Sequence, residues 1–175
     1  MTNEFEAENA VEELPVKSQE LTLADFKNKN NFLRTPEVGS TMELEIVKIV
    51  NNPIISGTNK KTGKTFDIGL KDKNKKVTRY DIIATIGELT INSWEVYFKL
   101  LGKDGLLTNY AEKHDGKFTG AKISIKRLMD GNHANYKIPE LAAILQKPIA
   151  EAQKYQDEVK LAMKEHRLYE VKLLD

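Results

Sequence analysis

The sequence contains no cysteine among its 175 residues. Disulfides, thiolate metal ligands and cysteine nucleophiles are therefore excluded, and the composition is typical of a reducing compartment, so we expect a cytoplasmic protein. Histidine is scarce as well, because His114, His133 and His166 stand at no recognisable metal-ligand spacing from one another. We expect neither a metal nor a cofactor.

Long apolar runs are also missing. No stretch approaches the roughly 20 residues that span a bilayer, and the amino-terminal MTNEFEAENAVEELP is acidic and lacks the apolar core of a signal peptide. We therefore expect no membrane partner. No serine stands in a local hydrolase motif, and Glu43 and Glu45 have no partner cluster. We accordingly expect a protein that is not an enzyme.

Charge is nearly balanced overall but strongly segregated along the chain. The total is +1, whereas residues 1–40 carry −4, residues 41–138 carry +6 and residues 139–175 carry −1. The segment from Ser56 to Arg79 holds eight basic residues and only two acidic ones. Lysines at this density repel one another, so they need either solvent or an anionic partner. Both readings stay open, and a polyphosphate backbone is the leading partner.

The chain divides into three parts by composition. Residues 1–38 are predicted to be an acidic, largely disordered leader and connector, with a short helix over Leu21–Lys29, because few large apolar groups are present to offset the entropy of ordering. Residues 39–138 are predicted to form the domain, and residues 139–175 a helical segment. A hydrophobic content of 40% is enough for one core.

Alternating apolar residues predict five strands in the domain. They are expected at 41–50, 66–71, 77–86, 121–126 and 134–138, with a loop over 51–64 and a tight turn at Asp130-Gly131 before the last strand. In the first strand, the phase of the apolar residues breaks at Val47. We expect a β-bulge there that bends the strand.

Helical spacing appears between the third and fourth strands. Trp94, Tyr97, Phe98 and Leu101 recur with that period; Asn92 and Glu95 have capping-box spacing, and Gly102 is a natural stop. A second helix is predicted over 104–113. Beyond Pro139 a helical segment broken at Pro148 carries an apolar stripe, made by Ile149, Ala152, Tyr155, Val159 and Met163. The stripe either packs on the domain or forms a homo-oligomer.

Five short strands with a helix between the third and fourth is the order of the OB-fold, a partly open Greek-key barrel. We therefore predict a mainly β chain with helices: a five-stranded OB-like Greek-key barrel with a helical insert between strands 3 and 4 and a C-terminal helical segment. The basic stretch falls on strands 2 and 3 and their loops, where OB-folds bind oligonucleotides. Residues 39–138 thus resemble the OB-fold single-stranded DNA-binding proteins of bacteriophages and mobile elements.

The resemblance implies a sequence-tolerant protein of DNA replication or recombination that coats single-stranded DNA, in the host cytoplasm if phage-encoded. In such proteins lysines track the backbone and aromatic rings stack on bases. The acidic amino-terminal segment, which the usual bacterial form lacks, is where we expect replication or recombination proteins to bind. RNA fits the same chemistry, since the sequence reveals no contact to a 2′-hydroxyl.

The predicted nucleic-acid-binding residues follow from this placement. Phosphate contacts are expected from Lys60, Lys61, Lys64, Lys71, Lys73, Lys75, Lys76 and Arg79, and base stacking from Phe66, Tyr80 and Tyr136. Lys122 and Lys126 either extend this cationic track or form a solvent-exposed outer face of the sheet. Phe66 and Tyr80 are in phase with apolar neighbours, so each faces either the ligand or the core. Trp94 is expected in the core.

The sequence offers three alternatives to this function. GTNKKTGKT has five residues, not four, between its first glycine and Gly63-Lys64-Thr65, and it leads into a strand, so it is not a P-loop. The principal alternative is a non-enzymatic protein-interaction or assembly module, such as a viral structural or regulatory factor, on a small β-barrel. A metal-dependent enzyme acting on phosphates is a remote third.

Overall fold

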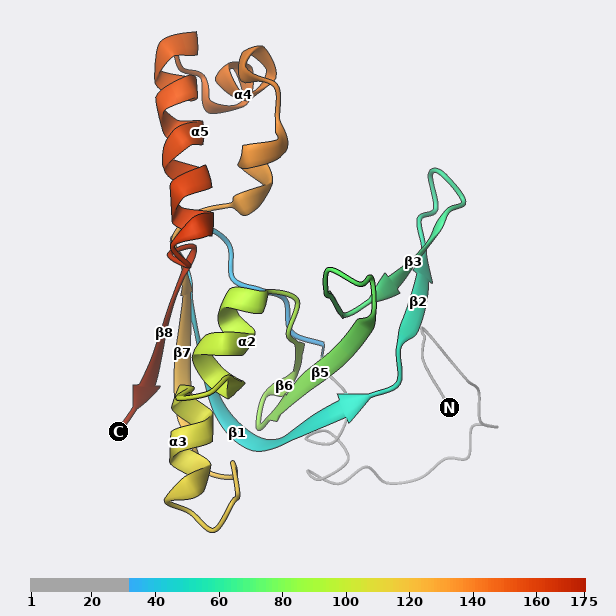
Figure 1. Cartoon of the computed structure of the whole chain (residues 1–175), viewed down its shortest axis with the longest axis vertical. Helices are drawn as coiled ribbons and strands as arrows, with labels where there is room; N and C mark the ends of the chain where they lie inside the picture. The colour runs from blue at the N-terminus through green and yellow to red at the C-terminus, as the bar shows by residue number, and fades with distance from the viewer. Residues whose placement is uncertain (1–31) are drawn as a thin grey trace, which may run out of the picture.

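The computed structural model describes residues 32–175, which form a mixed α/β structure with a mostly antiparallel sheet (Figure 1). In this range six strands share one sheet, in the order β4-β5-β1-β7-β8 with β6 paired to β5, while β2 and β3 form a separate two-stranded ribbon. No pairing among these residues joins β8 to the β4 and β6 side, so a closed barrel is not confirmed. The predicted leader and its helix lie outside the described residues, apart from the connector after Asn31.

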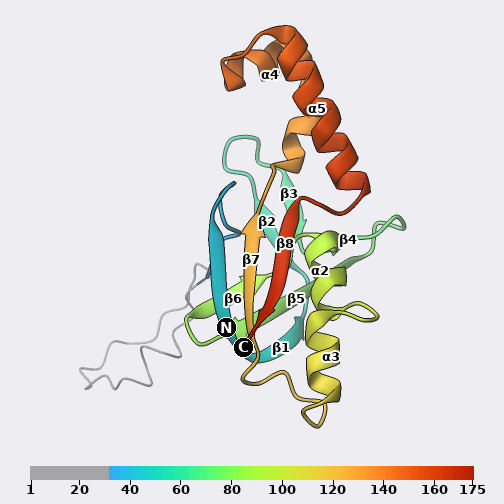
Figure 2. The same cartoon turned by 90° about the vertical axis from the view of Figure 1, so that its left-hand side faces the viewer.

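The first strand, β1 (Thr41–Asn52), is long and bent. Its first half pairs with β7 (Lys122–Arg127) and its second half with β5 (Val77–Ala84). The register with β5 shifts between Ile46 and Lys48, which confirms the bulge predicted at Val47. Because a bulge adds one residue to one strand, the strand bends there, and the sheet curls around one core (Figure 2).

The predicted loop at 51–64 contains a further strand, which corrects the prediction. β2 (Ile55–Thr58) pairs with β3 (Thr65–Ile68), so a hairpin replaces the loop. The predicted second strand is interrupted at Gly69, whose φ is +149°, and resumes as β4 (Leu70–Lys71). A Cβ on Gly69 would lie 2.8 Å from the Thr78 carbonyl oxygen, so only glycine fits there.

The third predicted strand is confirmed as β5, and it turns back into β6 (Gly87–Thr90). The helical insert follows as α2 (Trp94–Leu101) and α3 (Leu106–Glu112), close to the predicted ranges. The N-cap of α2 is Ser93, whose Oγ accepts a hydrogen bond from the Val96 N–H, instead of Asn92. Gly102 ends the helix as predicted. Leu100 of α2 and Leu107 of α3 are buried in the core beside Ile82 and Ile123.

The predicted fifth strand at 134–138 is wrong. The Asp130 carboxylate accepts a hydrogen bond from the Asn132 N–H, and the chain turns into a 3-10 helix (Gly131–Asn135) and then into α4 (Ile138–Leu145). α5 (Ile149–Lys164) begins after Pro148, which confirms the predicted break. No helix among residues 32–175 is long and apolar enough to cross a bilayer.

The carboxyl-terminal segment also supplies a strand that was not predicted. β8 (Tyr169–Leu174) pairs with β7 at the end of the sheet. Its apolar residues Tyr169, Val171 and Leu173 alternate with Glu170 and Lys172, which was a readable strand signal.

Helices α4 and α5 form a lobe that stands away from the sheet (Figures 1 and 2). Of the predicted apolar stripe, Ala152 and Val159 are buried, but Ile149 is 58% exposed and Met163 is 42% exposed. The buried part packs against α4 and the 3-10 helix. Homo-oligomerisation through this segment stays a prediction.

One buried carboxylate links α2 to β8. Glu95 Oε1 accepts a hydrogen bond from the Leu168 N–H at 3.0 Å, and Oε2 accepts one from the Tyr169 N–H at 2.7 Å. Lys99 Nζ lies 2.8 Å from Glu95 and also donates to the carbonyls of His166 and Tyr169. A carboxylate is stable in the interior only when it is paired and hydrogen-bonded, and Glu95 is both.

Replacing Glu95 should therefore destabilise the fold. Glu95→Ala leaves two backbone N–H groups without their acceptor and the Lys99 ammonium without its counter-charge, and we expect a loss of about 2 kcal/mol in the free energy of unfolding, measured in urea. The control is Glu165→Ala, which removes the exposed Arg167–Glu165 ion pair and should cost less than about 0.5 kcal/mol. Equal losses for the two variants would contradict the role assigned to Glu95.

Candidate nucleic-acid interface

The tip of the β2–β3 hairpin, residues 59–64, is an ordered turn. Asn59 Oδ1 accepts hydrogen bonds from the N–H groups of Lys61 at 2.9 Å and Thr62 at 3.3 Å. The backbone N–H of Asn59 donates to the Lys64 carbonyl at 2.8 Å, and that of Gly63 to the Asn59 carbonyl at 2.8 Å. Lys60, Lys61 and Lys64 are exposed on this hairpin tip.

A second ordered turn joins β4 to β5. Asp72 Oδ1 accepts hydrogen bonds from the Asn74 N–H at 2.8 Å and the Lys76 N–H at 3.1 Å. We call residues 71–76 the lysine turn, and its four lysines, Lys71, Lys73, Lys75 and Lys76, are exposed. These side chains gain nothing from the core, so they are available to an anion.

Four aromatic side chains from α2 and β5 form a cluster. The Trp94 and Phe98 rings are stacked with centroids 5.6 Å apart, and Tyr97 meets the edge of Trp94 at 5.6 Å. Tyr80 of β5 lies 5.0 Å from Tyr97, which completes the aromatic cluster. Phe98 is 52% exposed, although it is apolar. Burial raises the pKa of Tyr97, and its hydrogen bond with Tyr80 raises it further, so its hydroxyl stays neutral at pH 7.

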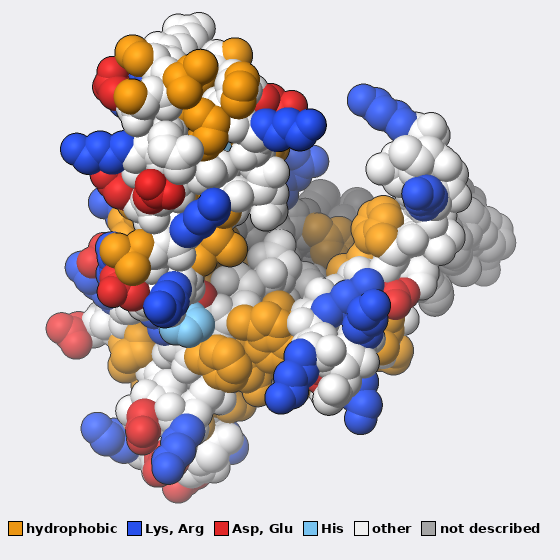
Figure 3. Space-filling view, turned by 45° about the horizontal axis from the view of Figure 1, so that its top comes forward, with side chains coloured by type: hydrophobic (Ala, Val, Ile, Leu, Met, Phe, Trp, Pro, Cys, Tyr) orange, Lys and Arg blue, Asp and Glu red, His pale blue; other side chains and the backbone are white. Residues whose placement is uncertain are grey.

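One hydrogen bond brings the aromatic cluster to the lysine turn. Trp94 Nε1 donates to the Lys71 carbonyl oxygen at 2.8 Å. Figure 3 shows the result as a hydrophobic patch beside Lys and Arg side chains, in a hollow between the lobe of α4 and α5 and the two basic turns. Aromatic rings and cations are therefore exposed together on one face of the molecule.

The sequence did not decide whether Phe66 and Tyr80 face the ligand or the core, and the structure puts the two rings in different places. Tyr80 lies on the core side of β5 with Ile82 and packs against Tyr97. Phe66 is 52% exposed on the hairpin, and its ring covers Gly57, where a Cβ would lie 2.7 Å from the ring. Phe66 thus belongs to the hairpin, and Tyr80 forms the buried side of the aromatic cluster.

Arg79 differs from the other predicted phosphate ligands, because its side chain is only 8% exposed. Its guanidinium is bonded to Asp81, with Nη2–Oδ2 at 3.0 Å and Nε–Oδ1 at 3.1 Å. Asp81 also accepts hydrogen bonds from Thr90 and Asn52. Burial raises the pKa of nearby Glu88, and the charge of Asp81 adds to the rise. Arg79 thus belongs to a buried polar network and is not presented to a ligand.

Lys122 and Lys126 lie on the face of the sheet opposite the core and the aromatic cluster. Lys122 stands across from Glu45 of β1, and Lys126 across from Glu170 of β8. Their cross-strand neighbours are acidic. Of the two alternatives, this placement favours a solvent-exposed outer face over an extension of the cationic track. Tyr136 is at the base of the lobe, where its carbonyl accepts a hydrogen bond from Gln156, and it is not brought near the basic turns.

Sequence reasoning missed Phe98 and treated Trp94 as a core residue. Their helical spacing was recognised, but a periodic aromatic face on a helix usually indicates burial. Trp94 is only half-buried and Phe98 is exposed, and Trp94 at the start of α2 is bonded to the lysine turn. Exposure of one helix face was not readable from the spacing.

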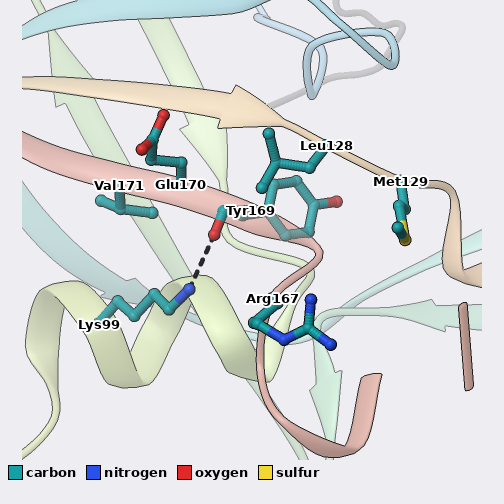
Figure 4. Close-up of a pocket in the computed structure, with 7 residues that line it drawn as sticks. All are labelled: Lys99, Leu128, Met129, Arg167, Tyr169, Glu170 and Val171. Atoms are coloured by element: carbon teal, nitrogen blue, oxygen red, sulfur yellow. Dashed lines mark hydrogen bonds between the residues drawn. The ribbon is translucent and has the colours of Figure 1, made fainter. Parts of the chain in front are cut away.

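A pocket of about 330 Å³ lies between α2, the end of β7 and the start of β8 (Figure 4). Its two cations are already bonded: Lys99 Nζ to Glu95 and two carbonyls, and Arg167 to Glu165 at 2.7 Å. The pocket therefore offers no unpaired cation to a phosphate. Among residues 32–175, no three histidine or acidic side chains converge as a metal would require.

The chain has no significant match to a protein-family model, to a curated protein or to a solved structure.

Proposed function

We propose that this protein binds single-stranded DNA with little sequence preference and acts, without catalysis, in replication or recombination in the cytoplasm. The observation that carries the proposal is the Trp94–Lys71 hydrogen bond, because the exposed Phe98 ring stacks on Trp94, which is bonded to the lysine turn. Single-strand binders combine cations for the backbone with aromatic rings for the bases. Stacking is worth about 1–3 kcal/mol per base and accepts any base.

We also infer that the sheet is an opened, OB-like arrangement. Three features support this: the bulged β1 is shared between β5 and β7, the helices α2 and α3 separate β6 from β7, and the sheet curls around one core. The OB-fold is itself a partly open barrel that binds oligonucleotides on one face and adjoining loops. The lysine turn is one such loop.

A protein-interaction or assembly module is the second candidate. The exposed Ile144 and Ile149 of the lobe favour it, because exposed apolar side chains suit a protein partner better than a phosphate backbone.

Fluorescence anisotropy separates the two candidates. A labelled oligo-dT of about 30 nucleotides, longer than a typical single-strand site, is titrated at two salt concentrations beside a blunt duplex. Binding to oligo-dT that weakens with salt supports the proposed function. Failure to bind oligo-dT at low salt would favour the interaction module, and equal affinity for the duplex would contradict the single-strand preference.

Phe98→Ala should weaken oligo-dT binding about tenfold, since it removes an exposed stacking surface. Trp94 is the only tryptophan, so its fluorescence should be quenched when a base stacks on the aromatic cluster. The matched control is Phe32→Ala, an equally large change at a 65% exposed ring beside β6. Equal weakening in both variants, or unchanged Trp94 fluorescence on binding, would exclude the aromatic cluster as the base-binding surface.

The combined variant Lys71→Gln, Lys73→Gln and Lys76→Gln should flatten the salt dependence. Each phosphate contact contributes about 0.7 to the slope of log affinity against log salt on a single strand, so the slope should fall by about 2. Lys75 is kept because its φ of +62° makes any substitution there harder to interpret. Lys122→Gln with Lys126→Gln, on the opposite face, should leave the slope unchanged. If only the Lys122/Lys126 control lowered the salt slope, the DNA backbone would bind on that face and not at the lysine turn.

A further inference from the structure

The hairpin tip and the lysine turn are two separate basic sites. The hairpin extends away from the six-stranded sheet (Figures 1 and 2). Lys64 and Lys71 are separated along the chain by β3 and by the break at Gly69. The aromatic cluster contacts the lysine turn, and the hairpin carries its own exposed ring, Phe66.

The β2–β3 ribbon has two different faces. Ile55 stands across from Ile68 and Gly57 from Phe66 on one face, whereas Ser56 and Asp67 share a 2.9 Å hydrogen bond on the other. Because Gly57 has no side chain, the tip of the Phe66 ring lies close over it, and Phe66 is still 52% exposed. An exposed aromatic ring near lysines can stack on the end of a base stack.

The hairpin tip is also pre-organised. Four hydrogen bonds to or from Asn59 hold the turn, so the backbone positions of Lys60, Lys61 and Lys64 are set before any ligand binds. The lysine turn is held in a similar way, so what distinguishes the hairpin tip is its position at the end of a separate two-stranded ribbon. A two-stranded antiparallel ribbon also has the right dimensions for the major groove, which is about 12 Å wide.

We propose that the β2–β3 hairpin binds the duplex adjoining the single strand, so that the preferred ligand is a junction of single-stranded and duplex DNA. In this arrangement Phe66 covers the last base pair, the hairpin tip contacts duplex phosphates, and the single strand continues onto the lysine turn and the aromatic cluster. Residues 59–64 include three lysines and no acid, which complements the phosphates. The inference rests on the proposed single-strand function.

The test compares three DNA ligands by anisotropy at equal salt. They are oligo-dT, a duplex of about 12 base pairs, just over one helical turn, and the same duplex carrying a dT tail of about 18 nucleotides. The wild-type protein should bind the tailed duplex about tenfold more tightly than oligo-dT, with a salt slope steeper by about 2.7, the share of three contacts to B-form DNA.

Two hairpin variants test whether the preference for the tailed duplex comes from the hairpin. Lys60→Gln, Lys61→Gln and Lys64→Gln together should abolish the preference for the tailed duplex but leave oligo-dT affinity within about twofold. Phe66→Ala should reduce the preference without changing the salt slope. The lysine-turn variant is the matched control, because it should weaken binding to both ligands. Unchanged thermal unfolding checks that the exposed substitutions leave the fold intact.

Two outcomes would overturn the inference while the proposed function stands. One is equal wild-type affinity for oligo-dT and the tailed duplex. The other is a loss of oligo-dT binding in the hairpin-tip variant as large as in the lysine-turn variant, which would make the tip part of the single-strand path. Failure of the wild type to bind oligo-dT at all would instead overturn the proposed function, and this inference with it.

Discussion

The structure depends on how the carboxylate of Glu95 is satisfied. Helix α2 has only eight residues, too few to be stable alone, so its position comes from its contacts. Glu95 and Lys99 bind the backbone at the start of β8, and Trp94 binds the backbone of the lysine turn. One short helix thus connects the last strand of the sheet to the main basic turn, and it carries the aromatic rings between them.

The contacts of Glu95 and Lys99 also shield the start of the edge strand β8 from pairing with other chains. β8 is an edge strand, and an edge strand with free N–H and C=O groups invites pairing with other chains. Both backbone groups of Tyr169 are already bonded, its N–H to Glu95 and its C=O to Lys99. The same two side chains therefore position the aromatic cluster and occupy the first backbone groups of the edge.

The two basic turns follow one physical rule. Each begins with a side-chain acceptor, Asn59 or Asp72, that bonds backbone N–H groups two or more residues further on. Such turns hold the backbone while leaving the lysine side chains in solvent. The fold tolerates the charge repulsion between these lysines, because the turn backbones are held by local hydrogen bonds and no lysine contributes to the core.

Much of the local structure was predictable, because it depends on neighbours in sequence. The alternation of Met42, Leu44 and Ile46, the bulge at Val47, the helix stop at Gly102 and the break at Pro148 were all readable and are confirmed. The strand predicted at 134–138 failed because one side chain, Asp130, caps a helical turn and outweighs a weak strand pattern. β2 and β6 have only four residues each, and their formation depends on a partner, whereas the alternation in β8 was readable.

By itself, the sequence determined where charge concentrates, where the chain turns and which residues alternate. Tertiary structure decided which face each residue occupies and what it contacts. Arg79 and Tyr80 are adjacent, yet one is bonded to Asp81 in a buried network and the other packs in the aromatic cluster. Alternation assigns neighbours in a strand to opposite faces, but only the helices and strands that pack on each face decide which one is buried.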